Sequence, residues 1–308
     1  MRVHAVPRPK DTCLSFAVAY DAIAAEYDAQ VRGDDWMRRV LHAHYARVFR
    51  PGQRVLDVGC GTGIDALTLA GMGVRVLGID GSAAMVQRLE RKVGQERLGP
   101  LVEARVLRIE DLAHLGQERF DGAISAFASL SALPDLTGFA RDAARLVRPG
   151  GHLVMHALNR FSLWEFVGYV ARRDFAAAAR VGRLRQRTFV IGGQRVGHSL
   201  YFPDEAYRRF FAASFRRVDR YSLGALRPPH TVRRLPRGLV SALEWLDVRG
   251  GRWPLVRNAG RFFVLDLERL ADVQRPEHER RAGDSGQQAG DDGAHGAVRR
   301  DQAERHTH

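Results

Sequence analysis

A glycine-rich turn is the feature of this sequence best suited to chemistry. The β-rich run of residues 54–58 leads into Gly59-Cys60-Gly61-Thr62-Gly63, and a helical stretch follows over residues 64–72. Glycines at a strand-to-helix turn let backbone amides approach a ligand closely, and the amino end of the helix favours negative charge. The turn alone is ambiguous, because residues 61–66 also satisfy the G-x-G-x-x-A dinucleotide pattern.

Two aspartates help to separate the ligand classes. Asp57 lies two residues before the first glycine, where a carboxylate would repel a pyrophosphate but can hold an ammonium group. A ligand that carries an amino-acid moiety beside an adenosine therefore fits better than a dinucleotide. Asp80 ends the second β-rich run and is placed to bind both ribose hydroxyls, a requirement that the two ligand classes share. Met85 could cover an adenine face or simply pack in the core.

The elements that position this turn alternate between strand and helix. β-rich runs occur at residues 54–58, 75–79, 104–109, 120–125 and 152–158, with helical stretches between them, which predicts a parallel sheet built from βαβ units. We divide the chain into five segments: an N-terminal helical cap (1–50), a cofactor-binding core (51–158), an insertion of two helices and a hairpin (159–212), the end of the core (213–271) and a disordered tail (272–308).

The composition is that of an ordinary globular chain with an uneven charge. Of the 48 basic residues only Lys10 and Lys92 are lysines, and the net charge is +13. Residues 171–257 hold 19 arginines and six acids, an excess that equals the whole net charge. This stretch is a solvated surface, or else it attracts nucleic acid, anionic lipid or an acidic substrate. With two cysteines, no apolar run of about 18 residues and no signal-peptide pattern, we expect a cytoplasmic protein.

Four motifs in order resemble those of class I S-adenosylmethionine-dependent methyltransferases, small-molecule branch. They are VLDVGCGTGIDALTLA, VLGIDGSAAMV, FDGAISAF and ARLVRPGGHLVM, and they cover roughly residues 50–160. The resemblance implies an α/β fold: a Rossmann-like, seven-stranded, mostly parallel sheet with helices on both faces, an N-terminal helical cap and an insertion after the fifth strand. Its last strand, near residues 261–267, would insert antiparallel. The implied cofactor is S-adenosyl-L-methionine, with S-adenosyl-L-homocysteine as product.

The same resemblance implies roles for individual residues. Asp57 and Gly59 would hold the methionine end of the cofactor, Asp80 the ribose, and Met85 and Ile109 the adenine. Ser125 would lie near the sulfonium, and two tyrosines of the N-terminal helix would cap the cofactor. The full expected cofactor set is Tyr20, Tyr27, Asp57, Gly59, Gly61, Gly63, Asp80, Gly81, Ser82, Met85, Ile109, Glu110, Asp111 and Ser125. Arg108 stands where relatives often carry an acidic or polar residue, which puts the contact to the adenine amino group in doubt.

The acceptor side is less defined. Methyl transfer is an in-line displacement that needs a base only where the acceptor must lose a proton. Weak candidates for catalysis are His156, in an apolar strand typical of core residues, His198, which could face solvent, and Tyr201. Expected substrate contacts are Phe127, Asn159, Trp164 and Tyr169. No metal site is expected, because the tail histidines His278, His295, His306 and His308 lack metal-ligand spacing.

Several alternatives stay open. The expected partner is a small-molecule acceptor, with transfer to O or N, in a monomer or homodimer. Nucleic acid is disfavoured, because no Asn-Pro-Pro-aromatic motif follows the fourth strand and no cysteine stands where C5 pyrimidine chemistry would need one. An RNA or protein methyltransferase could still use the Arg-rich stretch. An inactive regulatory subunit would expose an apolar patch over residues 161–175, and a basic lid could touch an anionic membrane. An NAD-linked oxidoreductase is the weakest alternative.

Overall fold

The computed structural model describes residues 9–229, 232 and 235–271, with side chains from Phe16 onward. All described residues except Ala271 belong to one compact unit that ends at Leu270. The predicted tail, its histidines and the Cys13 side chain lie outside the described residues. Cys60 is buried and not part of a disulfide.

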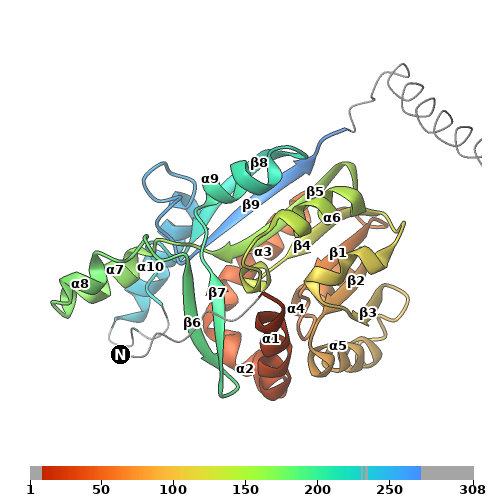
Figure 1. Ribbon diagram of the computed structural model, residues 1–308, viewed down its shortest axis with the longest axis horizontal. Helices are drawn as coiled ribbons and strands as arrows, with labels where there is room; N and C mark the ends of the chain where they lie inside the picture. Colours follow the sequence, from red (N-terminus) through yellow and green to blue (C-terminus); the bar gives the residue numbers. More distant parts are fainter. Residues whose placement is uncertain (1–8, 230–231, 233–234, 272–308) are drawn as a thin grey trace, which may run out of the picture. The chain divides into compact units, whose positions relative to one another are not determined.

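One seven-stranded sheet organises the described chain (Figure 1). The order is β3-β2-β1-β4-β5-β9-β8, and β9 is antiparallel to both neighbours while β3, β2, β1, β4 and β5 run parallel. The strands are β1 Arg54–Val58, β2 Arg75–Asp80, β3 Val102–Val106, β4 Phe120–Ser125, β5 Val147–Leu158, β8 Phe215–Leu223 and β9 Phe262–Arg269. The predicted seven-stranded, mostly parallel fold with an antiparallel last strand is confirmed.

Helices cover both faces of the sheet, as predicted. The helices are α1 Pro9–Ile23, α2 Tyr27–Gln30, α3 Asp35–Val48, α4 Ile64–Gly71, α5 Ala83–Gln95, α6 Thr137–Leu146, α7 Leu163–Ala171, α8 Phe175–Ala178, α9 Pro203–Ala206 and α10 Arg237–Gly250. The core on one face joins α3, α4 and α5 to Val55 and Val154, and the core on the other face joins α6 to Leu56 and Leu153. Neighbouring strand residues thus face opposite sides, which leaves the central strands buried on both faces.

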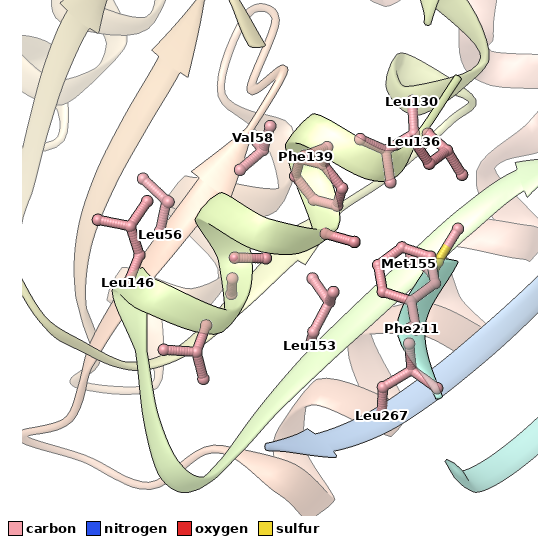
Figure 2. Close-up of a cluster of buried hydrophobic side chains, with 14 of the residues drawn as sticks. Leu56, Val58, Leu130, Leu136, Phe139, Leu146, Leu153, Met155, Phe211 and Leu267 are labelled. Carbon is pink, nitrogen blue, oxygen red and sulfur yellow. The ribbon is translucent and has the colours of Figure 1, made fainter. Parts of the chain in front are cut away.

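Figure 2 shows the core on the α6 side. Phe139 and Leu146 of α6 pack over Leu56 of β1 and over Leu153 and Met155 of β5, and each of these side chains is at most 4% exposed. Because this core anchors the central strands, it also fixes the carboxyl ends of β1 and β4, where the candidate site lies.

The predicted third strand differs in its bounds from the structure. The third strand was predicted at residues 104–109, but β3 is Val102–Val106. Its register begins with Val102 opposite Val76 and ends with Val106 opposite Asp80, after which a 3₁₀ segment begins at Ile109 and ends the strand. After the hairpin the chain forms α9 and then a π turn at Tyr207–Phe211.

The insertion folds beside the N-terminal cap. It contains α7, α8 and the hairpin of β6 (Gln186–Ile191) and β7 (Gln194–Ser199). The hairpin packs on α1 through Phe16, Ala19 and Val196 (Figure 1). None of the helices in the described part of the chain has the length and apolar character needed to cross a bilayer.

Candidate cofactor site and a neighbouring cavity

A cavity lies between the carboxyl ends of the strands and helix α1. It contains about 750 Å³ of empty space including open solvent. Nine of the predicted cofactor residues line it: Tyr20, Tyr27, Gly59, Gly61, Asp80, Gly81, Met85, Ile109 and Glu110. The structure thus brings together residues from α1, the β1 turn, the ends of β2 and the segment after β3.

The glycine turn forms the floor of this cavity. Gly59, Gly61 and Gly63 have φ angles of +73°, +54° and +83°, which L side chains rarely adopt. A Cβ atom on Gly59 would also overlap Ser129, whose hydroxyl donates to the Gly59 carbonyl at 3.1 Å. Glycine is therefore required here both for backbone conformation and for close packing against the turn after β4.

Asp80 presents a fixed carboxylate to the cavity. Its two oxygens accept hydrogen bonds from the backbone N–H groups of Gly61 (2.9 Å) and Ser82 (2.8 Å). Burial raises the pKa of Asp80, and these two hydrogen bonds lower it in part. Each oxygen keeps further lone pairs, so the carboxylate can still accept hydrogen bonds from a ligand's hydroxyl groups.

Asp21 and Asp28 hold the N-terminal helices over the cavity. Asp21 anchors α1, and Asp28 anchors α2. Asp21 accepts hydrogen bonds from the Ser82 hydroxyl (2.5 Å) and from the Ala84 N–H (3.0 Å) at the amino end of α5. Asp28 pairs with Lys92 of α5 (2.6 Å) and accepts a hydrogen bond from the Thr62 hydroxyl. Tyr20 and Tyr27, which these contacts hold in the cavity wall, pack edge to face with ring centroids 6.1 Å apart.

The other end of the cavity combines an apolar side chain, Met85, with a charged one, Arg108. Met85 is 1% exposed and also lines the cavity, so it serves the core and the site together. Arg108 lines the cavity as well and donates to the Asp111 carboxylate at 2.8 Å. This pairing turns Asp111 toward Arg108.

Five predicted cofactor residues do not line the cavity: Asp57, Gly63, Ser82, Asp111 and Ser125. Gly63 caps α4, the Ser82 hydroxyl caps α5 and the Ser125 hydroxyl donates to the Val58 carbonyl at 2.9 Å. Asp57 lies beneath the turn, 1% exposed, and its Oδ2 has no hydrogen-bond partner among the described residues. Burial, then the charge of Asp65, raises the pKa of Asp57 well above its ordinary value. A direct role for these five residues stays a prediction.

A strained turn after β4 closes the far side of the cavity. Phe127 and Ala128, both in its wall, have φ angles of +49° and +68°. The Phe127 N–H donates to Nδ1 of His156 at 3.1 Å, and the His156 ring packs between Phe127 and Phe262. His156 therefore holds the turn in place as a neutral, buried ring, which suits a structural role better than that of a base.

His156 gives a testable acid sensitivity. Burial lowers its pKa from 6.5 to about 3. Between these values the unfolded chain binds a proton at this position and the folded chain does not, so stability falls as the pH drops through this window. The slope is at most about 1.4 kcal/mol per pH unit. Neighbouring Arg38 and Arg261 stay charged throughout.

We therefore expect wild type to exceed His156→Gln in thermal stability near neutral pH, with the difference shrinking as the pH is lowered toward about pH 4. Thermal melts at a series of pH values measure this. If the stability difference between wild type and His156→Gln stays constant over the series, the folded and unfolded chains protonate His156 alike. That result would contradict the lowered pKa of a buried ring.

A second cavity lies on the other side of the hairpin's contact with α1. It contains about 1,570 Å³ of empty space including open solvent. Its wall holds three of the four predicted substrate contacts, Asn159, Trp164 and Tyr169, while Phe127 lines the first cavity. Trp36 and Phe189 add aromatic surface. The Asn159 amide donates to the carbonyls of Asn258 and Gly260, and the Trp164 indole donates to the Leu226 carbonyl, which fixes both residues in this wall.

The remaining catalytic candidates are buried. His198 was predicted as possibly solvent-facing, but it is 5% exposed because its ring packs between Phe16 and Phe189. Burial lowers the pKa of His198 to about 4, so the ring is neutral near pH 7. The Tyr201 hydroxyl donates to the Leu133 carbonyl at 2.8 Å, and burial raises its pKa to about 12.

Sequence reasoning missed several residues of the first cavity. Phe16, Ser129 and Leu133 line it, and none was predicted as a contact. Phe16 lies one helical turn before Tyr20, so the three-to-four-residue helical spacing could have found it. Ser129 and Leu133 carry no such signal, since only the positive-φ turn at Phe127 and Ala128 brings them to the glycine loop. Among the described residues no cluster of three or more His, Cys, Asp or Glu could hold a metal ion.

Comparison with known proteins agrees with this geometry. Residues 55–151 match a methyltransferase domain family. A ubiquinone biosynthesis O-methyltransferase from Alkalilimnicola ehrlichii is 40% identical over 114 residues, which are 35% of this chain and 43% of that protein. The chain thus matches less than half the length of this curated relative.

Solved structures share the fold at low identity. A 1,6-didemethyltoxoflavin-N1-methyltransferase from Burkholderia thailandensis, with its substrate and S-adenosylhomocysteine bound, is 20% identical at a TM-score of 0.51, covering 88% of this chain and 94% of that one. The [4+2]-cyclase SpnF is 16% identical at a TM-score of 0.54, covering 87% and 100%. Because one of these is a cyclase by name, the fold alone does not define the reaction.

The matched core contains the glycine turn, both strand-end aspartates and the segment that follows β3. Three features of the first cavity fit S-adenosylmethionine: the positive-φ glycines, the fixed Asp80 carboxylate and the tyrosines that cover the cavity. Residues 55–151 therefore match a methyltransferase domain in sequence, and this matched stretch carries the glycine turn and Asp80 of the first cavity.

Proposed function

We propose that the chain transfers a methyl group from S-adenosylmethionine to an oxygen or nitrogen atom of a small molecule held in the second cavity. The observation that carries this proposal is the separation of the two cavities by one row of rings. Phe16 lines the first cavity, Phe189 lines the second, and His198 packs against both, with ring centroids 4.7 and 4.8 Å away. In-line transfer needs the acceptor atom in contact with the methyl group, so an acceptor held in the second cavity must displace this row of rings to reach the cofactor.

The chain's own residues would bind and align the reactants. S-adenosylmethionine supplies an electrophilic methyl group on a positively charged sulfur. Asp80 would accept from the ribose hydroxyls, and Tyr20 and Tyr27 would exclude water above the glycine turn. Alignment of this kind can supply much of the rate of an in-line displacement, since about 7–11 kcal/mol of a barrier can come from proximity and orientation.

The second cavity favours an acceptor with a flat or apolar body. Trp36, Trp164, Tyr169 and Phe189 contribute aromatic surface to its wall, and aromatic pairs prefer stacked or edge-to-face contact. The name of the Alkalilimnicola relative, an O-methyltransferase, supports transfer to oxygen. Where the acceptor must lose a proton, His198 is the candidate that lies between the two cavities, because its ring packs against Phe16 of one wall and Phe189 of the other. Burial lowers its pKa to about 4, so it would be a weak base.

Tyr169→Ala tests the acceptor site. Loss of an aromatic contact of about 1.4 kcal/mol corresponds to roughly tenfold weaker methyl transfer at low acceptor concentration. Affinity for S-adenosylhomocysteine should not change, because Tyr169 does not line the first cavity. Tyr169→Phe keeps the ring and serves as the control. Equal activity of Tyr169→Ala and wild type would place the acceptor elsewhere.

The proposal as a whole is tested with methyl-labelled S-adenosylmethionine, purified protein and an extract of the source organism. Label is counted in the organic-soluble, small aqueous, nucleic-acid and protein fractions. We expect label in one of the two small-molecule fractions. Label confined to RNA or protein would contradict the proposal and favour the Arg-rich surface as the acceptor site. Cofactor binding without label in any fraction would favour a regulatory subunit.

A further inference from the structure

Helix α7 is apolar, yet it leaves one side exposed and buries no residue fully. Its sequence, LWEFVGYVA, has one charged residue, and no residue of the helix is buried. Glu165, the charged residue, is held in a bidentate pair with Arg187 of the hairpin. Phe166, Val167 and Val170 are exposed. A helix with this composition normally buries a face, so its exposure here indicates a surface for a partner.

Three neighbouring segments extend this apolar surface: α8, α10 and the segment after α10. Phe175 of α8 is 65% exposed, and in the segment after α10 Trp253 is 54% and Leu255 92% exposed. Helix α10 adds Trp245, whose ring lies 4.4 Å from the Arg249 guanidinium. We call Phe166, Val170, Phe175, Trp245, Trp253 and Leu255 the α7–α10 face.

Direct contacts bring these segments together. The Leu163 N–H donates to the Ala259 carbonyl, and the Trp164 indole donates to the Leu226 carbonyl, so α7 is bonded to the chain on both sides of α10. Leu255 lines a shallow groove with Phe161 and Val181, which flank α7 and α8. Figure 1 shows α7, α8 and α10 at the same end of the described unit, in agreement with these contacts.

The charge around this face is strongly positive. Between residues 172 and 185 five exposed arginines accompany one exposed acid, Asp174. The side chain of Asp174 accepts from the Ala177 N–H and caps α8. Arg237 and Arg249 are exposed on α10, whereas Arg252 after it pairs with Asp219 at 2.6 Å, and Glu244 of α10 pairs with Arg39 and Arg227.

We propose that the α7–α10 face binds the surface of a bilayer that contains anionic phospholipids. Exposed tryptophan, phenylalanine and leucine with surrounding arginine is the composition of segments that lie in the membrane interface, with apolar side chains among the acyl chains and cations at the headgroups. A second copy of the chain would bring the same positive charge to the contact, and like charges oppose that association. Val167 and Arg172 also line the second cavity, so a bound bilayer would lie beside the acceptor site.

Vesicle flotation tests the proposal without cofactor or acceptor, so its failure is separate from failure of the proposed methyl transfer. Phosphatidylcholine vesicles with and without phosphatidylglycerol are mixed with the full chain at low and high salt. We expect binding to the phosphatidylglycerol vesicles alone and a loss of binding at high salt, because screening weakens the attraction of arginine to the headgroups.

Two variants probe the two components of this face. Phe175→Ser/Leu255→Ser removes two of the most exposed apolar side chains, and Arg172→Glu/Arg173→Glu reverses two charges. Each should lower the partition coefficient by about tenfold or more. The matched control, Val106→Ser/Arg141→Glu, changes exposed residues of β3 and α6 and should bind as wild type does.

Three results would overturn the proposal. They are equal binding to neutral and anionic vesicles, no binding to either, and equal losses in the control and the face variants. Sedimentation analysis of the same samples distinguishes the competing occupant: a dimer that the Phe175→Ser/Leu255→Ser variant abolishes would assign the face to a second copy of the chain.

Discussion

Asp80→Ala is expected to weaken binding of S-adenosylhomocysteine by about 100- to 10,000-fold, since hydrogen bonds to a charged group contribute about 1.5–3 kcal/mol each and a ribose offers two hydroxyls. The carboxylate lies in the cavity wall and is held there by the N–H groups of Gly61 and Ser82. Its removal deletes the acceptor and also frees the glycine turn. Isothermal titration of wild type and variant measures the change.

Asp111→Ala is the matched control for this experiment. Asp111 is another acid predicted to contact the cofactor, but it pairs with Arg108 and does not line the cavity. Its replacement should change the dissociation constant by less than about fivefold, or by under about 1 kcal/mol. Thermal melts of Asp80→Ala and of the more conservative Asp80→Asn show whether the fold is retained. Wild-type affinity in a folded Asp80→Ala protein, or equal losses in both alanine variants, would contradict the assignment of Asp80.

Arg38→Ala is expected to lower the free energy of unfolding by about 3–5 kcal/mol, the cost of leaving one charge of a buried pair without its partner. Arg38 of α3 pairs with Asp65 at the start of α4, and their side chains are 6% and 7% exposed. Burial alone would raise the pKa of Asp65, but the charge of Arg38 and the hydrogen bond with His42 lower it below its ordinary value. The Arg38 guanidinium also lies 4.0 Å from the Phe127 ring centroid, so its loss should loosen the wall of the first cavity.

Urea unfolding measures this change, and Arg39→Ala is the neighbouring control. Arg39 pairs with Glu244 at 2.9 Å, but its side chain is 67% exposed, and such pairs contribute about 0–1 kcal/mol. The double variant Arg38→Met/Asp65→Leu removes both charges and should be more stable than Arg38→Ala. Equal losses in Arg38→Ala and Arg39→Ala would contradict the role given to the buried pair.

Much of the fold could be predicted because its signals are local. The β-rich run of residues 54–58 is followed by glycines and then by a helical stretch. Strand β1 has the bounds predicted from this pattern. Asp80, at the end of β2, was found from its place after the second β-rich run. The parallel pairing of β1 with β2 then brings the carboxyl end of β2 beside the glycine turn, as expected of a crossover connection.

The rest depends on contacts between residues far apart in the sequence. Arg38 and Asp65 are separated by 27 positions, and neither residue type nor spacing indicates their pairing. The place of Ser125 near the sulfonium stays a prediction, and the hydrogen bond from its hydroxyl to the Val58 carbonyl of the neighbouring strand had no signal in the sequence. The row formed by Phe16, His198 and Phe189 needs a helix and a hairpin to meet, which periodicity cannot predict.

Hydrogen–deuterium exchange of the purified full chain, with and without S-adenosylhomocysteine, shows most directly where this ligand binds. We expect slower exchange in α1, in the turn at residues 59–63 and at the amino end of α5, because these segments surround the first cavity or latch over it. NAD⁺ at the same concentration should give no such protection. Protection by NAD⁺ instead, or protection by S-adenosylhomocysteine that leaves these three segments unchanged, would contradict the central claim that this cavity is the S-adenosylmethionine site.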